Sequence, residues 1–203
     1  MAGYIQINLK ELLRYAGEDE TKNILSSYLC PLNKDVDSFL KHKAVEFSKQ
    51  GIAATFLVFA SYKKDYVLVG YFTLATKIIA VYRTGLSKAM QKRIRKFAQY
   101  DSGFKRYHLA APLIGQLGKN YQNNYNNLIT GDELLKLACE KVKEIQVNIG
   151  GRFVYLECED KGKLIDFYSD NGFVRFGNRA LDRDEIGVME GRYLVQMLKY
   201  LGS

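Results

Sequence analysis

The residues with the clearest capacity for chemistry lie at the start of a predicted helix. Thr130 and Glu133 have the T-x-x-E spacing of a capping box, with Gly131 between them. Apolar residues at helical spacing follow, at Leu134, Leu135, Ala138, Val142 and Ile145. The first amides of a helix are unpaired and carry the positive end of its dipole, so this position could hold an anion such as phosphate or pyrophosphate. The same arrangement is common in mixed proteins, and alone it does not identify a ligand.

An apolar strand and a polar loop precede that helix and must position it. From Pro112 the chain reads PLIGQLGK, which is apolar enough for a buried strand, and Gly115 and Gly118 mark places for a bulge or a close backbone approach. A ligand could lie against that backbone. Residues 121–128 are almost wholly Asn, Gln and Tyr, which predicts an exposed loop beside the carboxyl end of the strand. Asp132 and Glu133 suit the helix dipole, but they would repel a pyrophosphate unless they point away from it.

Three further segments, GRFVYLECED, KGKLIDFYSDNGF and RYLVQMLKYL, follow the strand, loop and helix. The most specific piece is FYSDNGF, residues 167–173, which has the pattern F-Y-x-x-x-G-F. In the order and spacing of these pieces, the chain from Pro112 to its end, about half of the sequence, resembles the acetyl-CoA-dependent N-acetyltransferases of the GNAT superfamily. The resemblance implies an α/β (α+β) fold with a mixed, largely antiparallel central sheet, splayed parallel middle strands and flanking helices. It also implies one acyl-CoA N-acyltransferase domain over residues 1–203.

The resemblance further implies acetyl-CoA as cosubstrate and a set of binding positions. Splayed strands leave backbone amides unpaired, and the pantetheine arm can supply partners for them. The implied contacts of the strand are backbone groups of Leu117, Gly118 and Lys119, and those of the pyrophosphate loop come from Asn126, Asn127, Ile129, Thr130 and Gly131. The family loop reads Q or R, two residues, Gly, one residue, then Gly or Ala. Here only the final Gly131 matches, and because the loop is longer than usual its register could instead shift toward residues 122–125.

Tyr168 is the catalytic residue that the resemblance implies. The family's tyrosine at this position lies near the cofactor sulfur and can protonate the departing thiolate, as a general acid. A lone tyrosine among fifteen would ordinarily be a core residue, and the motif favours the catalytic role. The base is unassigned: Glu157, Glu159 and water remain alternatives. No activated Cys or Ser is apparent, so attack should be direct.

Residues 83–106 carry most of the net charge of +8. Met90, Ile94 and either Phe97 or Ala98 share a helical face, which predicts an amphipathic helix over residues 87–99 with a cationic outer side. The segment has one acid, Asp101, against the cations Arg83, Lys88, Lys92, Arg93, Arg95, Lys96, Lys105 and Arg106. Such a face is usually solvated surface. The alternatives are docking of an acidic acceptor such as RNA by phosphate attraction, and contact with the CoA phosphates.

The amino-terminal half shows less specific patterns. Residues 1–32 read as an irregular or helical lead, with an apolar face at Leu9, Leu12, Leu13 and Tyr15. A helix is predicted from Val36, capped by Asn33 or Asp35 and ended by Gly51. His42 lies off its apolar stripe and should be solvated. Strands over 53–60 and 66–81, joined by SYKKD, predict a hairpin with a bulge at Gly70.

Composition limits the other classes of function. The chain is 47% hydrophobic, which is typical of a globular protein. Cys30, Cys139 and Cys158 are far apart and form no metal-binding spacing with His42 or His108, so no metal is expected. No apolar run is long enough for a membrane span, and the beginning of the sequence lacks a leader pattern, so a cytoplasmic protein with no membrane contact is expected.

The sequence therefore predicts an N-acetyltransferase that transfers acetyl from acetyl-CoA to a primary amine by direct attack in a ternary complex. The amine could belong to a small molecule, a peptide or an aminoacyl-tRNA, the last as in the toxin-like branch of the family. The alternative from another class is a non-catalytic acyl-CoA-binding module, which the altered loop favours. The acceptor and the oligomeric state stay open.

Overall fold

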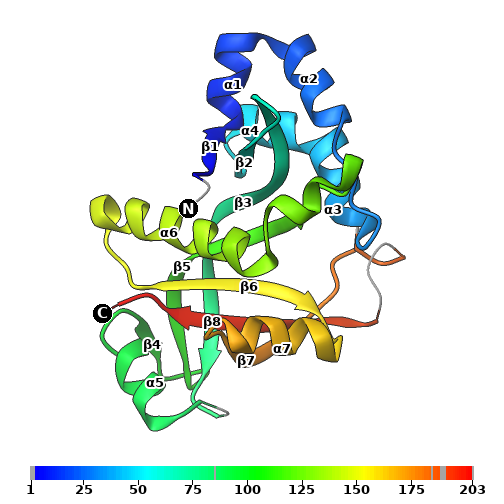
Figure 1. Cartoon of the computed structure of the whole chain (residues 1–203). Coiled ribbons are helices and arrows are strands. Elements are labelled where there is room, and N and C mark those ends of the chain that lie inside the picture. The colour runs from blue at the N-terminus through cyan, green and yellow to red at the C-terminus, as the bar shows by residue number, and fades with distance from the viewer. Residues whose placement is uncertain (1–2, 85, 184, 188–190, 203) are drawn as a thin grey trace. The chain divides into compact units, whose positions relative to one another are not determined.

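The computed structural model describes residues 3–84, 86–183, 185–187 and 191–202. The chain forms two compact units (Figure 1). Unit 1 consists of Met1–Ala75 and Gly115–Ala138, and unit 2 consists of Thr76–Ile114 and Cys139–Ser203. Strands β3 (Asp65–Tyr82) and β5 (Arg106–Lys119) and helix α6 (Gly131–Ile149) each contribute to both units.

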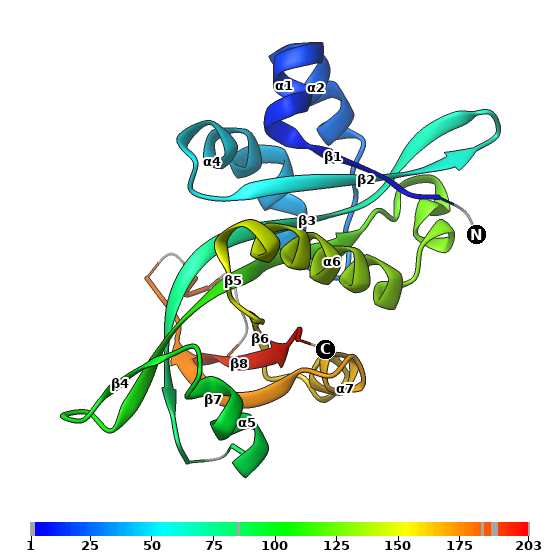
Figure 2. The same ribbon diagram turned by 90° about the vertical axis from the view of Figure 1, so that its left-hand side faces the viewer.

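Unit 1 contains an antiparallel arrangement of β1 (Ile5–Asn8), β2 (Ala54–Tyr62) and the first part of β3 (Figure 2). Lys63 and Lys64 form the two-residue turn between β2 and β3, and both have the positive φ that tight hairpins require, at +49° and +77°. The pairing shifts where Val58 faces Gly70 and Phe59 faces Leu68, so the extra residue lies next to Gly70. The predicted hairpin and bulge are confirmed.

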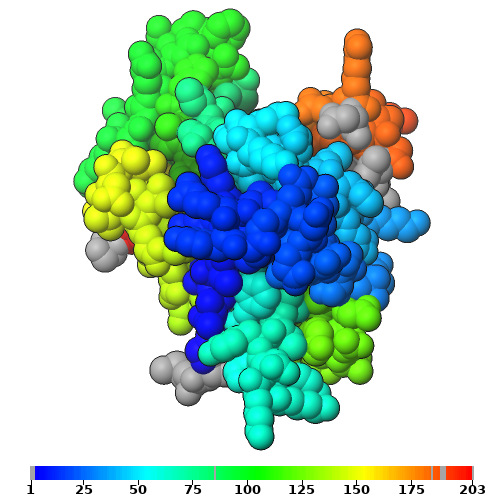
Figure 3. Space-filling view, turned by 90° about the horizontal axis from the view of Figure 1, so that it is seen from above, coloured from blue at the N-terminus to red at the C-terminus, as the bar shows by residue number. Residues whose placement is uncertain are grey.

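The helices of unit 1 are α1 (Leu9–Ala16), α2 (Glu18–Ser26), α3 (Lys34–Ser38) and α4 (Ala44–Gln50), with a π-helical turn, Phe39–Lys43, between the last two. Figure 3 shows α1 and α2, in blue, at the surface of unit 1. Asn33 caps α3 by accepting hydrogen bonds from two backbone amides, and Gly51 ends α4 in the left-handed conformation at φ +72°. Both predicted ends of this helical segment are confirmed, and His42 is exposed as expected.

The first 32 residues differ from the expectation in two respects. They begin with strand β1, whose four residues are too few to show an alternating pattern. Tyr15 was expected on an apolar face, but it is 85% exposed. Leu9 is fully buried and Leu12 and Leu13 are partly buried, so the buried face of α1 is narrower than the pattern indicated.

Unit 2 contains α5 (Lys88–Ile94), β4 (Gln99–Asp101), β6 (Phe153–Glu159), α7 (Gly162–Asp170), β7 (Val174–Ala180) and β8 (Tyr193–Tyr200). Strands β5 and β6 are parallel, with two pairs in register, Leu113 with Tyr155 and Ile114 with Leu156. Strand β8 pairs antiparallel with both β6 and β7. Helix α5 ends at Ile94, five residues earlier than predicted, and Phe97 is 41% exposed. Strand β7 was not predicted.

Backbone pairing gives the strand order β1-β2-β3-β5-β6-β8-β7, with β4 paired to β5. The sheet is mostly antiparallel, contains the parallel pair β5 and β6, and is flanked by helices, as the resemblance implied. Each unit has a core of its own: Leu9, Leu40 and Tyr71 are central to that of unit 1, and Ile94, Phe153 and Leu198 to that of unit 2. Among the described residues, no helix has the length and apolar character needed to cross a bilayer.

Candidate functional site

The start of α6 in unit 1 is closed by the predicted capping box. The amide and the hydroxyl of Thr130 both donate to Oε2 of Glu133, at 2.8 and 2.9 Å, and the amide of Glu133 donates to Oγ1 of Thr130 at 3.1 Å. These hydrogen bonds, above all the one from the Thr130 amide, lower the pKa of Glu133. The carboxylate is therefore ionised at neutral pH and lies on the first turn of the helix.

This geometry limits what the helix start can offer to an anion. The Thr130 amide is already used by Glu133, whereas the Gly131 amide takes no part in the capping box. A negative charge also remains at the positive end of the helix dipole. Among the predicted loop residues, Gly131 is thus better placed than Thr130 to supply a backbone donor.

The polar loop before α6 is a pair of 3₁₀ turns, Gln122–Leu128, and most of its side chains are exposed. Asn123 and Asn124 are left-handed, at φ +50° and +61°, a conformation that Asn adopts more readily than most residues. The loop is tied to the end of β5, because Nζ of Lys119 donates to the carbonyl of Asn126 at 3.1 Å.

The remaining predicted loop residues have different surroundings. The side chain of Asn126 donates to that of Asn127 at 3.2 Å, and both remain accessible. Ile129 is 2% exposed and belongs to the core, so only its backbone is available to a ligand. The structure thus places Lys119, Asn126 and Asn127 together, with Thr130 and Gly131 at the adjoining helix start.

Asn120 anchors the end of β5 and was not singled out in the sequence. It is fully buried, its amide donates to the carbonyl of Val69, and its side-chain nitrogen donates to the carbonyl of Leu68, both at 2.8 Å. Its side-chain oxygen accepts from the amides of Leu29 and Gln122, at 3.0 Å each. One side chain therefore fixes the strand end to β3 and to the segment after α2. An Asn beside a polar loop carries no sequence signal of such a role.

Gly118 is a point of close approach, as its position in the strand suggested. A Cβ added there would lie 2.4 Å from the hydroxyl oxygen of Tyr28 and 2.5 Å from Cγ1 of Val36. This face of the glycine therefore packs against the chain itself, and only the backbone edge of β5 remains for a ligand. The Tyr28 hydroxyl is buried and makes no hydrogen bond of ordinary geometry to a described residue. The Cys30 thiol lies beside it.

These groups of unit 1 fit the chemistry of acetyl-CoA. A pantetheine arm needs backbone donors and acceptors, and Leu117, Gly118 and Lys119, the residues expected to offer them, form the end of β5. A pyrophosphate needs cationic and amide donors, which Lys119 and the Gly131 amide supply. The Glu133 carboxylate opposes an anion at the same helix start.

Tyr168 lies in unit 2, on α7. Its side chain is 9% exposed and packs against the rings of Phe167 and Phe173, with centroids 5.0 and 5.9 Å away. The helix ends at Asp170, Gly172 follows it with φ +80°, and the amide of Phe173 donates to the carbonyl of Tyr168 at 3.0 Å. The motif FYSDNGF therefore builds the helix end that holds this tyrosine.

The environment of Tyr168 keeps its hydroxyl protonated. Burial raises the pKa of Tyr168, and the neighbouring Cys158 adds to the effect. Within the part of the chain that the structure describes, the hydroxyl makes no hydrogen bond. It is thus a neutral donor that the protein has not committed to a partner.

The two carboxylates considered as bases are both engaged. Glu157 accepts from Nε of Arg179 at 2.8 Å and from the side chain of Gln196 at 3.0 Å. Arg179 also pairs with Glu185 at 2.7 Å. Glu159 lies 3.0 Å from Nζ of Lys161. Each is held as an ion pair, so neither resembles a poised base, and water remains the alternative.

The cationic segment lies in unit 2. Ser87 caps α5 by accepting from the amide of Met90 at 3.2 Å, and Met90 and Ile94 are buried beneath the helix. The predicted cations of the segment are exposed except Arg106, which is partly buried near Asp101 at 4.0 Å. The three cysteines are buried and unpaired, and no cluster of potential metal ligands occurs within the described ranges.

Comparison with known proteins places the chain by its structure and not by its sequence. No family model matches it, and no curated protein matches it. The structure is similar to AtaT in complex with acetyl-methionyl-tRNAfMet, with a TM-score of 0.61, 18% identity, and coverage of 95% of this chain and 94% of that one. It is similar to a tyrosine-to-phenylalanine variant of KacT, with a TM-score of 0.61, 16% identity and coverage of 95% and 93%. It is also similar to AtaTR bound with AcCoA, with a TM-score of 0.55, 14% identity, and coverage of 95% of this chain and 91% of that one.

These likenesses confirm the fold that the resemblance implied: the chain has a GNAT fold over nearly its whole length. The similar structures thus include AtaT, which is described as a toxin, and KacT.

Proposed function

We propose that this protein is an N-acetyltransferase that transfers the acetyl group of acetyl-CoA to a primary amine. The observation that carries the proposal is the shared fold, which extends over 95% of this chain and includes a neighbour bound to AcCoA. Because those neighbours are matched over more than nine-tenths of their own chains, we also infer that units 1 and 2 belong to one acyltransferase domain. The three buried, unpaired cysteines suit a reducing cytoplasm.

Residues of unit 1 would hold the cosubstrate. The backbone of Leu117, Gly118 and Lys119 would bind the pantetheine arm, and Lys119 and Gly131 would bind the pyrophosphate, flanked by the side chains of Asn126 and Asn127. The backbone at Ile129 and Thr130 shapes this turn. The short β5 and β6 ladder supports this assignment, since a ladder of two pairs leaves most of β5 outside the pairing with β6.

Acetyl-CoA, when bound, supplies a thioester carbonyl carbon that an amine can attack. In the transfer, a carbon–nitrogen bond forms, the carbon–sulfur bond breaks, and the amine loses one proton while the sulfur gains one. A backbone amide near Gly118 or Lys119 would stabilise the negative charge on the carbonyl oxygen. Tyr168 would donate the proton to the sulfur, and its raised pKa keeps it in the donating form. Because Glu157 and Glu159 are ion-paired, the amine proton would leave through water.

The acceptor we propose is the amino group of an aminoacyl-tRNA. AtaT has been solved with acetyl-methionyl-tRNAfMet, and the exposed cations of residues 83–106 provide phosphate attraction for an RNA. The test mixes the protein with labelled acetyl-CoA and charged tRNA, and follows label in the RNA fraction. Charged tRNA should become labelled, and deacylated tRNA should not. If label appeared only on free amines or peptides, the protein would still be an acetyltransferase, but aminoacyl-tRNA would be excluded as its acceptor.

A non-catalytic acyl-CoA-binding module is the second candidate. The hydrogen bond from the Thr130 amide to Glu133 favours this candidate, because it leaves one donor fewer for the pyrophosphate at the helix start. Binding of acetyl-CoA without release of free CoA, with charged tRNA or with a panel of amines, would favour this function over the enzyme.

A further inference from the structure

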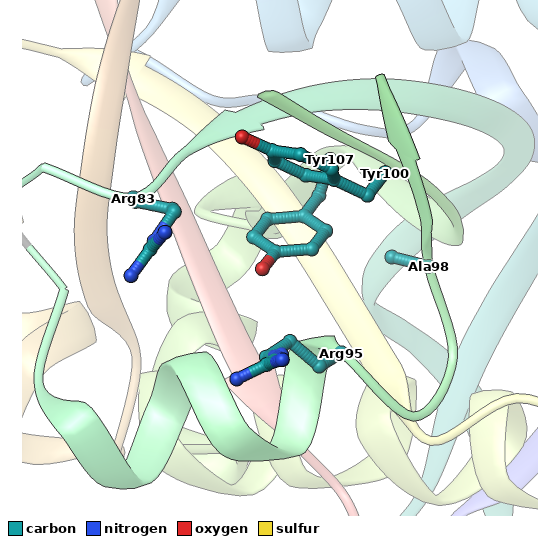
Figure 4. Close-up of a pocket in the computed structure, with 5 residues that line it drawn as sticks. All are labelled: Arg83, Arg95, Ala98, Tyr100 and Tyr107. Atoms are coloured by element: carbon teal, nitrogen blue, oxygen red, sulfur yellow. The ribbon is translucent and has the colours of Figure 1, made fainter. Parts of the chain in front are cut away.

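A pocket of about 410 Å³ opens within unit 2, beside the end of β3. Arg83, Arg95, Ala98, Tyr100 and Tyr107 line it (Figure 4). Its volume lies toward the lower end of the range of roughly 300–1,000 Å³ typical of ligand pockets. The sequence marked only its arginines, as part of the cationic segment. None of these five residues takes part in the proposed chemical step, although Arg83 and Arg95 belong to the cationic segment that would attract the RNA.

The two arginines of this pocket are cations that no residue described by the structure neutralises. In the described ranges of the chain, the guanidinium groups of Arg83 and Arg95 make no hydrogen bond or ion pair. Other arginines nearby are engaged: Arg93 lies 4.7 Å over the ring of Tyr200, and Arg106 lies 4.6 Å over the ring of Phe104. Figure 4 shows the side chains of Arg83 and Arg95 directed toward the space beside the tyrosine rings. Two unpaired guanidiniums at one pocket are suited to a phosphate.

The tyrosines add an aromatic surface to the same pocket. Tyr107 is 6% exposed, and its ring lies 5.0 Å from that of Tyr100 at an angle of 51°. Tyr100 is 46% exposed, so it presents ring surface to a ligand while Tyr107 supports it from the interior. Aromatic faces of this kind bind nucleobases by stacking, with little dependence on the base.

We propose that this pocket binds one unpaired nucleotide of an RNA, with its phosphate at Arg83 and Arg95 and its base on the ring of Tyr100. A pocket of this size suits a single nucleotide and not a duplex. The choice of RNA as the source rests on the proposed function, but binding itself requires no acetyl transfer. A free nucleotide has the same phosphate and base and could bind in the same way. The experiment below distinguishes it from an RNA.

The test is fluorescence anisotropy with a labelled, 5′-phosphorylated single-stranded hexauridylate, in the presence of saturating CoA. The probe contains uridine because an adenine nucleotide could bind at the cosubstrate site in place of CoA. The added CoA keeps that site occupied during the titration. Arg83→Ala with Arg95→Ala should weaken binding at least tenfold and reduce the slope of log affinity against log salt by about 0.7, the value for one single-strand phosphate. Tyr100→Leu should weaken binding by about five- to a hundredfold, and Tyr100→Phe should leave it unchanged.

The matched control is Lys88→Ala with Lys92→Ala, which removes two exposed cations of the same segment from outside the pocket. This variant should weaken binding less than the arginine pair does. Equal losses in both pairs, with no effect of Tyr100→Leu, would mean diffuse attraction and would overturn the proposal. Competition by uridine monophosphate as effective as by the oligonucleotide would overturn RNA as the source.

The outcome is separable from that of the proposed function. Loss of oligonucleotide binding in the pocket variants, in a protein that transfers no acetyl group, would support the pocket and refute the enzyme. Normal acetylation of charged tRNA by Tyr100→Leu, with unchanged RNA affinity, would support the enzyme and refute the pocket.

Discussion

At the scale of single residues, the proposed chemistry depends on the hydroxyl of Tyr168. Because burial raises its pKa, it remains a proton donor well above neutral pH. Tyr168→Phe removes the hydroxyl group that would donate the proton, and it keeps the ring contacts with Phe167 and Phe173. We expect kcat to fall by about 10²–10⁴-fold, the range for general acid–base catalysis, with unchanged affinity for acetyl-CoA. Steady-state kinetics and calorimetry measure the two quantities.

The control for this variant is Tyr15→Phe, which removes a hydroxyl from a side chain that is 85% exposed. It should leave kcat and affinity unaltered. If Tyr168→Phe retained wild-type kcat, Tyr168 would be a core residue, and the proton would reach the sulfur by another route.

Gly118 allows a second test at this scale. Gly118→Ala should lower the free energy of unfolding by about 1–3 kcal/mol, because the new methyl group overlaps the Tyr28 hydroxyl and Val36. Tyr28→Phe removes one of the overlapping atoms, an oxygen that makes no regular hydrogen bond among the described residues, and should recover part of that loss in the double variant. Urea denaturation measures each value, and Gly162→Ala, where no atom lies within 4 Å, is the control. If Gly118→Ala lowered the free energy of unfolding equally in the wild-type and Tyr28→Phe backgrounds, the proposed overlap with the Tyr28 hydroxyl would be wrong.

Single-residue roles were predictable where a local spacing carries them. The Thr130 and Glu133 capping box follows from four consecutive positions, and Gly118 was noted for its place in a strand. Asn120 and Tyr28 were not found, because their partners are distant in sequence. Asn120, for example, bonds to Leu68, 52 positions away, and nothing in the neighbouring residues indicates that contact.

At the scale of elements, the start of α6 sets a limit on anion binding. Glu133→Gln keeps a side chain that can complete the capping box while removing a negative charge from the helix start. We expect the affinity for acetyl-CoA to rise about two- to fivefold, corresponding to roughly 0.4–1 kcal/mol, and the free energy of unfolding to fall by about 0.3–1 kcal/mol, because the carboxylate also stabilises the helix start. Calorimetric titration measures the affinity, and Glu144→Gln near the other end of α6 is the control. An unchanged affinity in Glu133→Gln would place the pyrophosphate away from this helix.

Elements with a clear period and a clear terminus were predictable. The β2 and β3 hairpin and the start of α6 agree with the sequence because a polar turn and a capping box mark their limits. Helix α5 is shorter than its apolar period, since Arg95 leads into a turn before β4. Strand β7 was missed because its inward-facing residues are few: Phe176 is buried, whereas Val174 and Arg175 are exposed.

At the scale of the whole molecule, buried tyrosines should make the fold sensitive to alkali. Burial raises the pKa of Tyr28, Tyr71, Tyr155 and Tyr168 in the folded protein. Above about pH 10 the unfolded chain loses these protons and the folded chain keeps them, so stability falls as pH rises, by about 1.4 kcal/mol per pH unit for each such tyrosine. Denaturation measured across that range should show a slope that Tyr28→Phe reduces by one tyrosine's share. A flat profile would contradict the burial of these hydroxyls.

The overall fold was predictable from the order of a few motifs, although the sequence matches no family model. The motif FYSDNGF and the strand, loop and helix before it set the second half of the chain in the family's order. The division into two units was not predictable, because β3, β5 and α6 each continue through both, and no linker composition marks a boundary. The pocket of unit 2 was also beyond the sequence, since Arg83 and Tyr107 come together only through the pairing of strands and the turn after α5.

The central claim is that this GNAT fold binds acetyl-CoA, and isothermal titration calorimetry tests it most directly. Purified protein is titrated with acetyl-CoA at moderate salt, and the titration is repeated with adenosine diphosphate. We predict a dissociation constant near the micromolar range for acetyl-CoA, about −8 kcal/mol, and much weaker binding of the bare nucleotide, since only acetyl-CoA carries the pantetheine arm. Absence of heat with acetyl-CoA, or equal affinity for both compounds, would contradict the account.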